Sequence, residues 1–529
     1  MDVSMEKRAG PLETDCLLPL ASKDPRRQRP PQRRSPLAIW SRRFALIVLC
    51  LTGPFVMLYT LSVLMPTHSI HSNPLSHAFQ SNPIHVDGVG HFSEWSISQK
   101  NKFLADVNKD PTNAAKWVIV MGNEGGDLDS MTSALLWAYH LTHNATTASS
   151  SSSSSGKAPS EPELPIQAVA LLQTPFDALD LRPENKLALA NAKMSPGHSD
   201  LLTVDDLPMK PAQIAPLLHG LALVDHPRPR SMWAQGRILT LFDHHTDRGD
   251  APDAHPRIIE RTASCATLIA NYMLEERDQM KEPYHVSHEL LEMALSAIAL
   301  DSDGLTASIT THLDYSTASK LFDLAPGYHE PGQEESLPDV MKRLSKTLKK
   351  AKKDLDSLSV RDLLRRDWKG DVVHTSSDTV PDVHLGFASI PYSLRDMAEA
   401  KTKSESVQEW FSIESHWTEE IRADISVALT SYKVDAPPEH AESDKIKQRE
   451  IILVVRSDHR IDEEQADHLF RHIVDAVESA PNLDVVRWKA QKSSEKLEGR
   501  QMVWTHNTAD GGRKIVRPIV ENAVRSWAM

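Results

Sequence analysis

The stretch that decides the fold is Trp117-Val-Ile-Val-Met-Gly-Asn-Glu-Gly-Gly-Asp-Leu-Asp-Ser-Met131. Its first five residues are apolar and predict a short buried strand, and the glycine-rich segment after them predicts a turn. Apolar residues at helical spacing over 131–141 predict a helix immediately downstream. The order strand, loop, helix, with two aspartates in the loop, is typical of a parallel sheet that carries functional groups at the carboxyl ends of its strands.

The same rhythm repeats along the chain. Further strand candidates occupy 166–172, 221–224, 238–242 and 257–260, with helical stretches at about 263–276 and 287–299. Strands that alternate with helices predict an α/β fold, a doubly wound parallel-sheet domain over 113–325. A linker and amphipathic helix over 326–359 then lead into a smaller α+β domain over 360–529, with strand candidates at 384–390 and 451–456.

The amino terminus differs from the rest of the chain. Residues 44–65 contain no charge and would span about 33 Å as a helix. The preceding tail, 1–43, holds ten basic and five acidic residues. The positive-inside rule therefore predicts a disordered cytosolic tail, an N-terminal transmembrane signal anchor, a stalk over 66–112 and a lumenal body. We expect that body in a vacuole-like or other compartment of the secretory pathway.

Composition restricts the chemistry. The net charge of −13 argues against a general nucleic-acid binder. The three cysteines, Cys16, Cys50 and Cys265, are too few and too scattered for a disulfide framework or a CxxC zinc site. Any metal would be bound by nitrogen and oxygen ligands, which indicates Mg, Mn, Co or a histidine-rich zinc site.

Acidic and histidine residues lie where the predicted strands and one helix end. Carboxylates gathered at one edge of a sheet repel one another unless divalent cations neutralise them, so the sequence predicts a two-metal site. The candidate residues are Asp127, Asp129, Asp225, His244, His245 and Asp301.

This ordered series resembles the DHH phosphoesterase superfamily, with its Asp-x-Asp turn, its strand-end Asp-His, its Asp-His-His signature and a fourth Asp. In the second half, Leu364-Arg-Arg-Asp-Trp-Lys369 resembles an Asp-x-Lys segment, and Gly512-Arg-Lys514 resembles a phosphate-closing Ser-Arg-Lys motif. Both segments point to the branch of exopolyphosphatases, prune-type proteins and family II pyrophosphatases, in which a DHH domain precedes a DHHA2 domain. The resemblance is greatest to a fungal exopolyphosphatase.

The resemblance implies a role for each matching residue. His245 and Asp225 would be catalytic, and His245 would also bind substrate together with Lys369, Arg513 and Lys514. Asn123 stands where pyrophosphatases have histidine, which implies more tolerance of Mg. The implied metal ligands are Asp127, Asp129, Asp225, His244 and Asp301, which would hold two divalent cations, Mg or Mn, with Co as another candidate.

The sequence therefore predicts a membrane-anchored, metal-dependent exopolyphosphatase that releases terminal phosphate from inorganic polyphosphate with a metal-activated water. An inorganic pyrophosphatase or a prune-like short-chain polyphosphatase or phosphodiesterase is an alternative. A non-catalytic membrane-anchored interaction protein is an alternative of another class. The predicted partners are polyphosphate or pyrophosphate and the membrane, with no nucleic acid.

The sequence also allows expectations for several residues outside the predicted metal site, and for two of these groups it leaves two interpretations open. Ser264-Cys265-Ala-Thr267 opens a helix that could bind an anion, or it could be an ordinary helix cap. A second set of residues could bind a polyanionic tail, but a solvated helix face is the simpler interpretation: Lys346, Lys349, Lys350 and Lys353. Arg182 lies in a loop for which we expect a structural role, and His140 and His143 are expected on the surface.

Overall fold

The computed structural model describes residues 91–151, 167–328, 335–435, 445–508 and 511–529. The first sheet in these residues has the order β3-β2-β1-β4-β5-β6, and every strand pairing in it is parallel. Its strands are β1 (Trp117–Met121), β2 (Gln167–Leu172), β3 (Leu202–Thr203), β4 (Gly220–Val224), β5 (Ile238–Asp243) and β6 (Arg257–Ile259). The chain proceeds from β1 to one side of the sheet and later to the other, so the loops after β1 and β4 flank the point where the strand order reverses.

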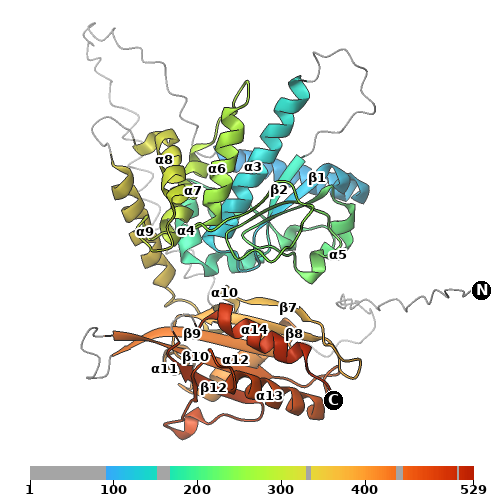
Figure 1. Ribbon diagram of the computed structural model, residues 1–529, viewed down its shortest axis with the longest axis vertical. Helices are drawn as coiled ribbons and strands as arrows, with labels where there is room; N and C mark the ends of the chain where they lie inside the picture. Colours follow the sequence, from blue (N-terminus) through green and yellow to red (C-terminus); the bar gives the residue numbers. More distant parts are fainter. Residues whose placement is uncertain (1–90, 152–166, 329–334, 436–444, 509–510) are drawn as a thin grey trace, which may run out of the picture. The chain divides into compact units, whose positions relative to one another are not determined.

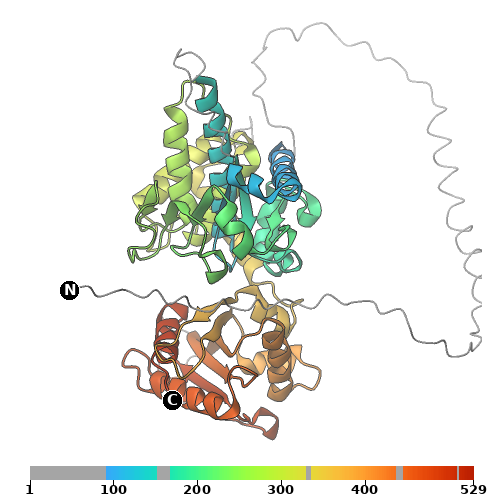
Figure 2. The same ribbon diagram turned by 90° about the vertical axis from the view of Figure 1, so that its right-hand side faces the viewer.

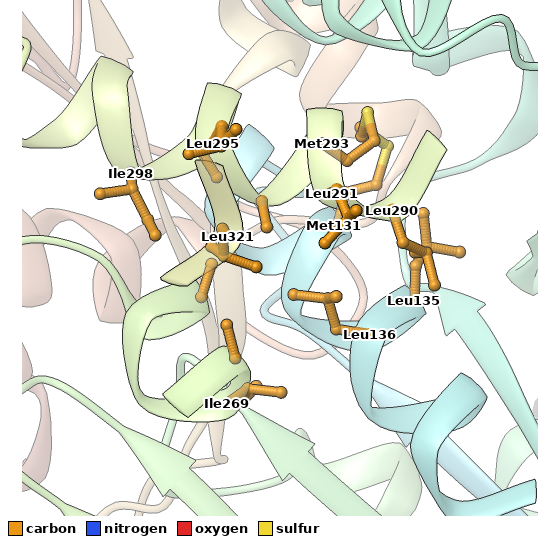
Figure 3. Close-up of a cluster of buried hydrophobic side chains, with 14 of the residues drawn as sticks. Met131, Leu135, Leu136, Ile269, Leu290, Leu291, Met293, Leu295, Ile298 and Leu321 are labelled. Atoms are coloured by element: carbon orange, nitrogen blue, oxygen red, sulfur yellow. The ribbon is translucent and has the colours of Figure 1, made fainter. Parts of the chain in front are cut away.

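The first sheet is buried on both faces because β1 is apolar at every position. Val118 and Val120 face a cluster that includes α3, α6 and α7, whereas Trp117 and Ile119 face the opposite cluster. Figure 3 shows Leu135 of α3, Ile269 of α6 and Leu291 of α7 in the first cluster. The larger helices of this part are α3 (Leu128–Ser151), α4 (Pro183–Asn191), α6 (Cys265–Asp278), α7 (His288–Asp301), α8 (His312–Leu324) and α9 (Leu337–Lys353).

One part of the predicted stalk is wrong. Residues 91–109 form a helix, α2 (His91–Lys109), which lies beside the first sheet (Figure 2, blue). Phe92, Phe103 and Val107 are buried on it. Burial of a phenylalanine side chain stabilises the fold by about 2 kcal/mol, so these residues join the core instead of forming a solvated spacer.

The second sheet is mixed, with the order β11-β12-β10-β9-β8-β7 and one parallel pairing between β8 and β9. Its strands are β7 (Lys369–Val373), β8 (Val383–Ile390), β9 (Ile425–Asp435), β10 (Lys445–Val455), β11 (Val485–Arg487) and β12 (Gln501–His506). One face packs with α13 (Glu463–Glu478) and α14 (Arg513–Arg525). The other packs with α10 (Val360–Arg366), α11 (Leu394–Lys401) and α12 (Val407–Glu420). The α/β class and the smaller α+β domain therefore agree with the prediction.

The N-terminal transmembrane helix of the predicted fold class is not supported. No helix within the described ranges is long and apolar enough to cross a bilayer. The predicted anchor at 44–65, like the basic tail before it, lies outside the described residues. The lumenal location rested on that anchor and remains an untested expectation.

Candidate metal centre

Three residues from two strand ends form the nucleus of the site. Asp225 follows β4, and His244 and His245 follow β5. Each offers a ligand atom, and the three atoms lie within 4.8 Å of one another. Because β4 and β5 are parallel neighbours, their carboxyl ends meet at one edge of the sheet, as the strand pattern predicted.

Asp225 is buried and held in a fixed orientation. Its backbone φ is +61°, in the left-handed region that residues other than glycine seldom adopt. Ser130 Oγ and Asn123 Nδ2 both donate to its Oδ2, the latter over 2.7 Å. Burial raises the pKa of Asp225, but the hydrogen bond and charge of His244 outweigh burial and lower it to about 2. The carboxylate is therefore ionised, with Oδ1 directed toward His244.

Asn123 is a positioning group for this carboxylate. Its Oδ1 accepts a hydrogen bond of 2.8 Å from the Gly125 N–H, while its Nδ2 donates to Asp225. Both ends of the amide are thus engaged within the protein. Asn123, which stands where the pyrophosphatases of the resemblance have histidine, therefore orients the predicted ligand Asp225.

His244 has the orientation of a metal ligand. Its Nδ1 lies 3.0 Å from the Thr262 carbonyl oxygen, which fixes the proton on Nδ1. Its Nε2 lies 3.3 Å from Asp225 Oδ1 and 3.7 Å from Asp129 Oδ2. Burial lowers the pKa of His244, but the hydrogen bond to Asp225 and the charges of Asp129 and Asp225 outweigh it and raise the pKa to about 10. Two carboxylates, those of Asp129 and Asp225, therefore lie close to Nε2, the nitrogen that is available to bind a cation.

His245 is oriented by a residue that the sequence analysis did not select. Asp243 is fully buried, and its Oδ1 accepts from the His245 backbone N–H (3.2 Å) and lies 2.7 Å from His245 Nδ1. The His245 ring is 42% exposed and lies 3.9 Å from Asp225. Asp243 could have been selected, because it is the first residue of the Asp-His-His signature.

Asp129 is bound by the amino terminus of α6. Its Oδ1 accepts from Ser264 Oγ (2.7 Å) and the Ala266 N–H (2.8 Å), and its Oδ2 accepts from the Cys265 N–H (2.7 Å). Burial and the charge of Asp225 nevertheless raise the pKa of Asp129 to about 6. The helix start at Ser264 therefore does bind an anion, and that anion is a carboxylate of the protein itself.

Asp127 and Asp301 are not part of the group whose ligand atoms lie within 4.8 Å of one another, but they interact electrostatically with Asp129. Asp127 Oδ1 accepts from the Ser130 N–H over 3.1 Å at the start of α3. Asp301 is the half-buried last residue of α7. Burial, followed by the charge of Asp129, raises the pKa of Asp301 well above its usual value. Both carboxylates are thus within electrostatic range of the predicted ligands.

These residues fit divalent cations. Carboxylate oxygens and an imidazole nitrogen are a donor set that suits Mg, Mn or Co. Burial, and after it the charge of a neighbouring carboxylate, raises the pKa of both Asp129 and Asp301, so both would be more readily ionised beside a positive charge. A bound cation would supply that charge and favour the ionised form of each carboxylate.

The predicted phosphate-binding residues Lys369, Arg513 and Lys514 differ in their surroundings. A Cβ atom on Gly125 would lie 2.8 Å from Lys369 Cε, so Lys369 approaches the loop that carries Asp127. Arg513 donates to Asp367 Oδ2 over 2.8 Å. Lys514 is exposed on α14.

Arg182 connects this group to the first loop. Its Nε donates to the Gly125 carbonyl oxygen (2.7 Å), and its guanidinium pairs with Glu184 (3.4 Å) and Asp367 (3.2 Å). Burial raises the pKa of Asp367, but the charges of Arg513 and Arg182 lower it to about 2. Arg182 therefore has a structural role, as expected. It connects the Gly125 backbone, two residues before Asp127, to Asp367, which also pairs with Arg513.

A cavity of about 420 Å³ is lined in part by the same loop. Gly125, Arg182 and Trp368 contribute to its lining, but none of the predicted metal ligands does. The strand-end carboxylates and histidines, and not this cavity, therefore carry the candidate chemistry.

Comparisons with known proteins match both halves of the chain. The DHH family, N-terminal domain, matches residues 117–298, and the DHHA2 domain matches residues 346–523. A putative exopolyphosphatase of Schizosaccharomyces pombe is 29% identical over 289 residues, which cover 53% of this chain and 67% of that protein. Exopolyphosphatase PRUNE1 of Rattus norvegicus is 28% identical over 258 residues, 47% of this chain and 48% of its own length. The match thus spans only about half of the mammalian relative.

Among solved structures, a putative family II inorganic pyrophosphatase of Methanococcus jannaschii is similar, with 17% sequence identity and a TM-score of 0.42. The match covers 77% of this chain and 99% of that one.

Proposed function

Because this chain belongs to the DHH superfamily, in the branch whose DHH domain is followed by a DHHA2 domain, we propose that it hydrolyses phosphoanhydride bonds with divalent cations as cofactors. The observation that carries the proposal is the convergence of Asp225, His244 and His245 within 4.8 Å. Asp129 lies beside them. Bound cations would supply a water of lowered pKa for attack on phosphorus.

Each side chain at the site has a separate role in this proposal. Asp129, Asp225 and His244 would hold the cations, and Asp127 and Asp301 would complete the ligand set. Asp243 orients His245, whose half-exposed ring can exchange a proton with a substrate oxygen. Lys369 and Arg513 would offset the negative charge of the phosphoryl group.

The preferred substrate in this proposal is inorganic polyphosphate, with release of terminal orthophosphate. The names of the fission yeast and rat relatives as exopolyphosphatases support this choice. Asn123 supports it as well, since the histidine found in pyrophosphatases is absent. Pyrophosphate hydrolysis is the second candidate, and Mg or Mn is the proposed metal.

The proposal is tested by assaying the purified chain for phosphate release from long-chain polyphosphate, tripolyphosphate and pyrophosphate with Mg, Mn or Co. We expect release from polyphosphate that exceeds release from pyrophosphate and stops when the metal is chelated. Absence of release from all three substrates with every metal would refute the proposal.

The alternative class is a non-catalytic protein that retains the fold. Asp129 separates the two, because its Oδ2 lies 3.7 Å from His244 Nε2 and it is a predicted metal ligand. In a catalytic protein, Asp129→Ala should abolish both metal binding and hydrolysis. Wild-type hydrolysis in that variant would refute the assigned site.

A further inference from the structure

The helix α9 carries an excess of positive charge on its exposed face. Its buried side consists of apolar residues such as Val340, Leu344 and Leu348. The helix contains only one acidic residue, Asp339, in a chain whose net charge is −13. The basic residues of α9 are Lys342, Arg343, Lys346, Lys349, Lys350, Lys352 and Lys353.

Most of these basic side chains form no ion pair with the residues that the structure describes. Arg343 pairs with Glu335 over 2.9 Å, and Lys349 pairs with Asp303. The other five side chains are exposed, and we find no ion pair for them with any residue that the structure describes. These five, Lys342, Lys346, Lys350, Lys352 and Lys353, are called the lysine face. Lysines four residues apart on a helix repel each other, so the arrangement costs stability unless an anion compensates it.

The position of α9 relates this face to the candidate metal centre. A Cβ atom on Gly304 would lie 3.1 Å from Lys342 Cα, which shows how closely the helix approaches the turn after α7. One to two turns further on, Ser345 Oγ donates to Asp303 over 3.2 Å, and Lys349 pairs with the same carboxylate. Successive turns of α9 therefore follow the chain backward, from Gly304 toward Asp301.

The last two turns of α9 lie near the carboxyl end of α7. Lys349 pairs with Asp303, two residues after the predicted ligand Asp301, and Lys352 and Lys353 follow within one turn. The row of unpaired lysines thus runs along the helix that packs against the turn after Asp301. An anion bound at the metal centre and extended in this direction would meet one positive charge after another.

We propose that the lysine face of α9 binds the part of a linear polyphosphate chain that extends beyond the metal centre. The proposal rests on the proposed function, since it assigns the surface that selects long substrates. An unbranched phosphate chain fits better than a single-stranded nucleic acid, because α9 has no aromatic side chain on which a base could stack. It fits better than a membrane surface, because no large apolar residue lies exposed among the lysines.

The test uses the full chain and the triple variant Lys342→Gln, Lys346→Gln, Lys350→Gln. Lys352 and Lys353, in the last turn of α9, are left intact. With metal present, we expect kcat/KM for long-chain polyphosphate, relative to tripolyphosphate, to fall about tenfold, as loss of three exposed charge contacts implies. The matched control removes three exposed lysines elsewhere, Lys102→Gln, Lys109→Gln and Lys281→Gln, and should keep the wild-type ratio.

A binding measurement separates this proposal from the proposed function. Long-chain polyphosphate is titrated onto each protein without metal at several salt concentrations. The slope of log Kd against log salt concentration should be smaller by about 2 in the triple variant, from roughly 0.7 per lost contact. A second triple variant, with Arg at the same positions, should bind as the wild type does.

Three results would overturn the proposal: wild-type binding and chain-length preference in the glutamine variant, tighter binding of single-stranded RNA than of polyphosphate, or lysine-dependent binding only to phosphatidylserine vesicles. If the wild type bound polyphosphate through these lysines but released no phosphate, the proposed function would fall and the lysine face would stand.

Discussion

The Asn123 side-chain amide donates a hydrogen bond of 2.7 Å to Asp225, across the point where the strand order of the first sheet reverses. The contact joins the loop after β1 to the end of β4. It fixes which oxygen of Asp225 faces His244, since Asn123 and Ser130 both engage the other oxygen. The metal centre therefore depends on an amide that need not touch a cation.

Substitution of Asn123 by Ala should weaken metal binding without removing a ligand. Loss of a group that orients a ligand typically lowers metal affinity by about 10- to 100-fold. Titration of Mn²⁺ into the variant, followed by calorimetry, measures the effect. Asn271→Ala, which removes an exposed amide on α6, is the matched control. Equal affinities in the Asn123 variant and the wild type would contradict the positioning role.

Metal binding should release protons. The pKa of His244 is raised to about 10 in the metal-free protein, so the ring is protonated at pH 7.5, whereas a metal ligand must be neutral. We expect about one proton released per cation bound at His244, and an affinity that rises with pH. Below pH 6, Asp129 also takes up a proton and weakens binding further.

Calorimetry in two buffers of different ionisation enthalpy at pH 7.5 counts these protons. His244→Ala should lower the release by about one proton per cation bound. Cation binding that is independent of pH between 6 and 8 would show that His244 is not a ligand.

Arg182 should contribute strongly to stability. Its partner Glu184 has 1% of its side chain exposed and would keep only one of its two arginine partners, Arg366, in Arg182→Gln. Loss of the buried, charged hydrogen bonds of Arg182 should cost about 2 kcal/mol. Arg365→Gln is the matched control, because its partner Asp177 is 70% exposed and such a pair contributes less than about 1 kcal/mol. Urea denaturation measures both free energies of unfolding. Equal losses in the two variants would contradict the assignment.

Acid should destabilise the fold through His140. Burial, with a smaller contribution from His143, lowers the pKa of His140 from 6.5 to about 4. Because the folded-state pKa is depressed, the stability that the neutral ring provides is fully present above pH 6.5 and is lost as the pH falls toward 4. The loss amounts to about 3 kcal/mol. His140→Gln should show a weaker decline of unfolding free energy over this range, and a decline as steep as that of the wild type would refute the prediction.

The sequence predicted the site well where the signal was local. An apolar run followed by an acid marks a strand end, so Asp225 and His244 could be assigned from their own neighbours. The bond between Asp129 and Ser264 could not, because 135 residues separate the two side chains. His140 was expected on the surface and is buried, since only the fold shows that Tyr284 packs over it.

The prediction of a stalk over 66–112 also failed for the residues of α2. Polar residues outnumber apolar ones in it, and the polar segment before it suggested a continuous stalk. Tertiary packing of Phe92 and Phe103, which no local pattern reveals, makes this segment a helix of the core.

The central claim is tested most directly by the rate of phosphate release from polyphosphate in the wild type and in Asp225→Asn. Asparagine keeps the shape of the side chain and tolerates the φ of +61° at this position, so the substitution removes mainly the charge. We predict metal-dependent release by the wild type and a fall of roughly 100-fold or more in the variant, as removal of a central electrostatic group implies. Release by the variant at the wild-type rate, or release by the wild type that persists with all divalent metal chelated, would contradict the account.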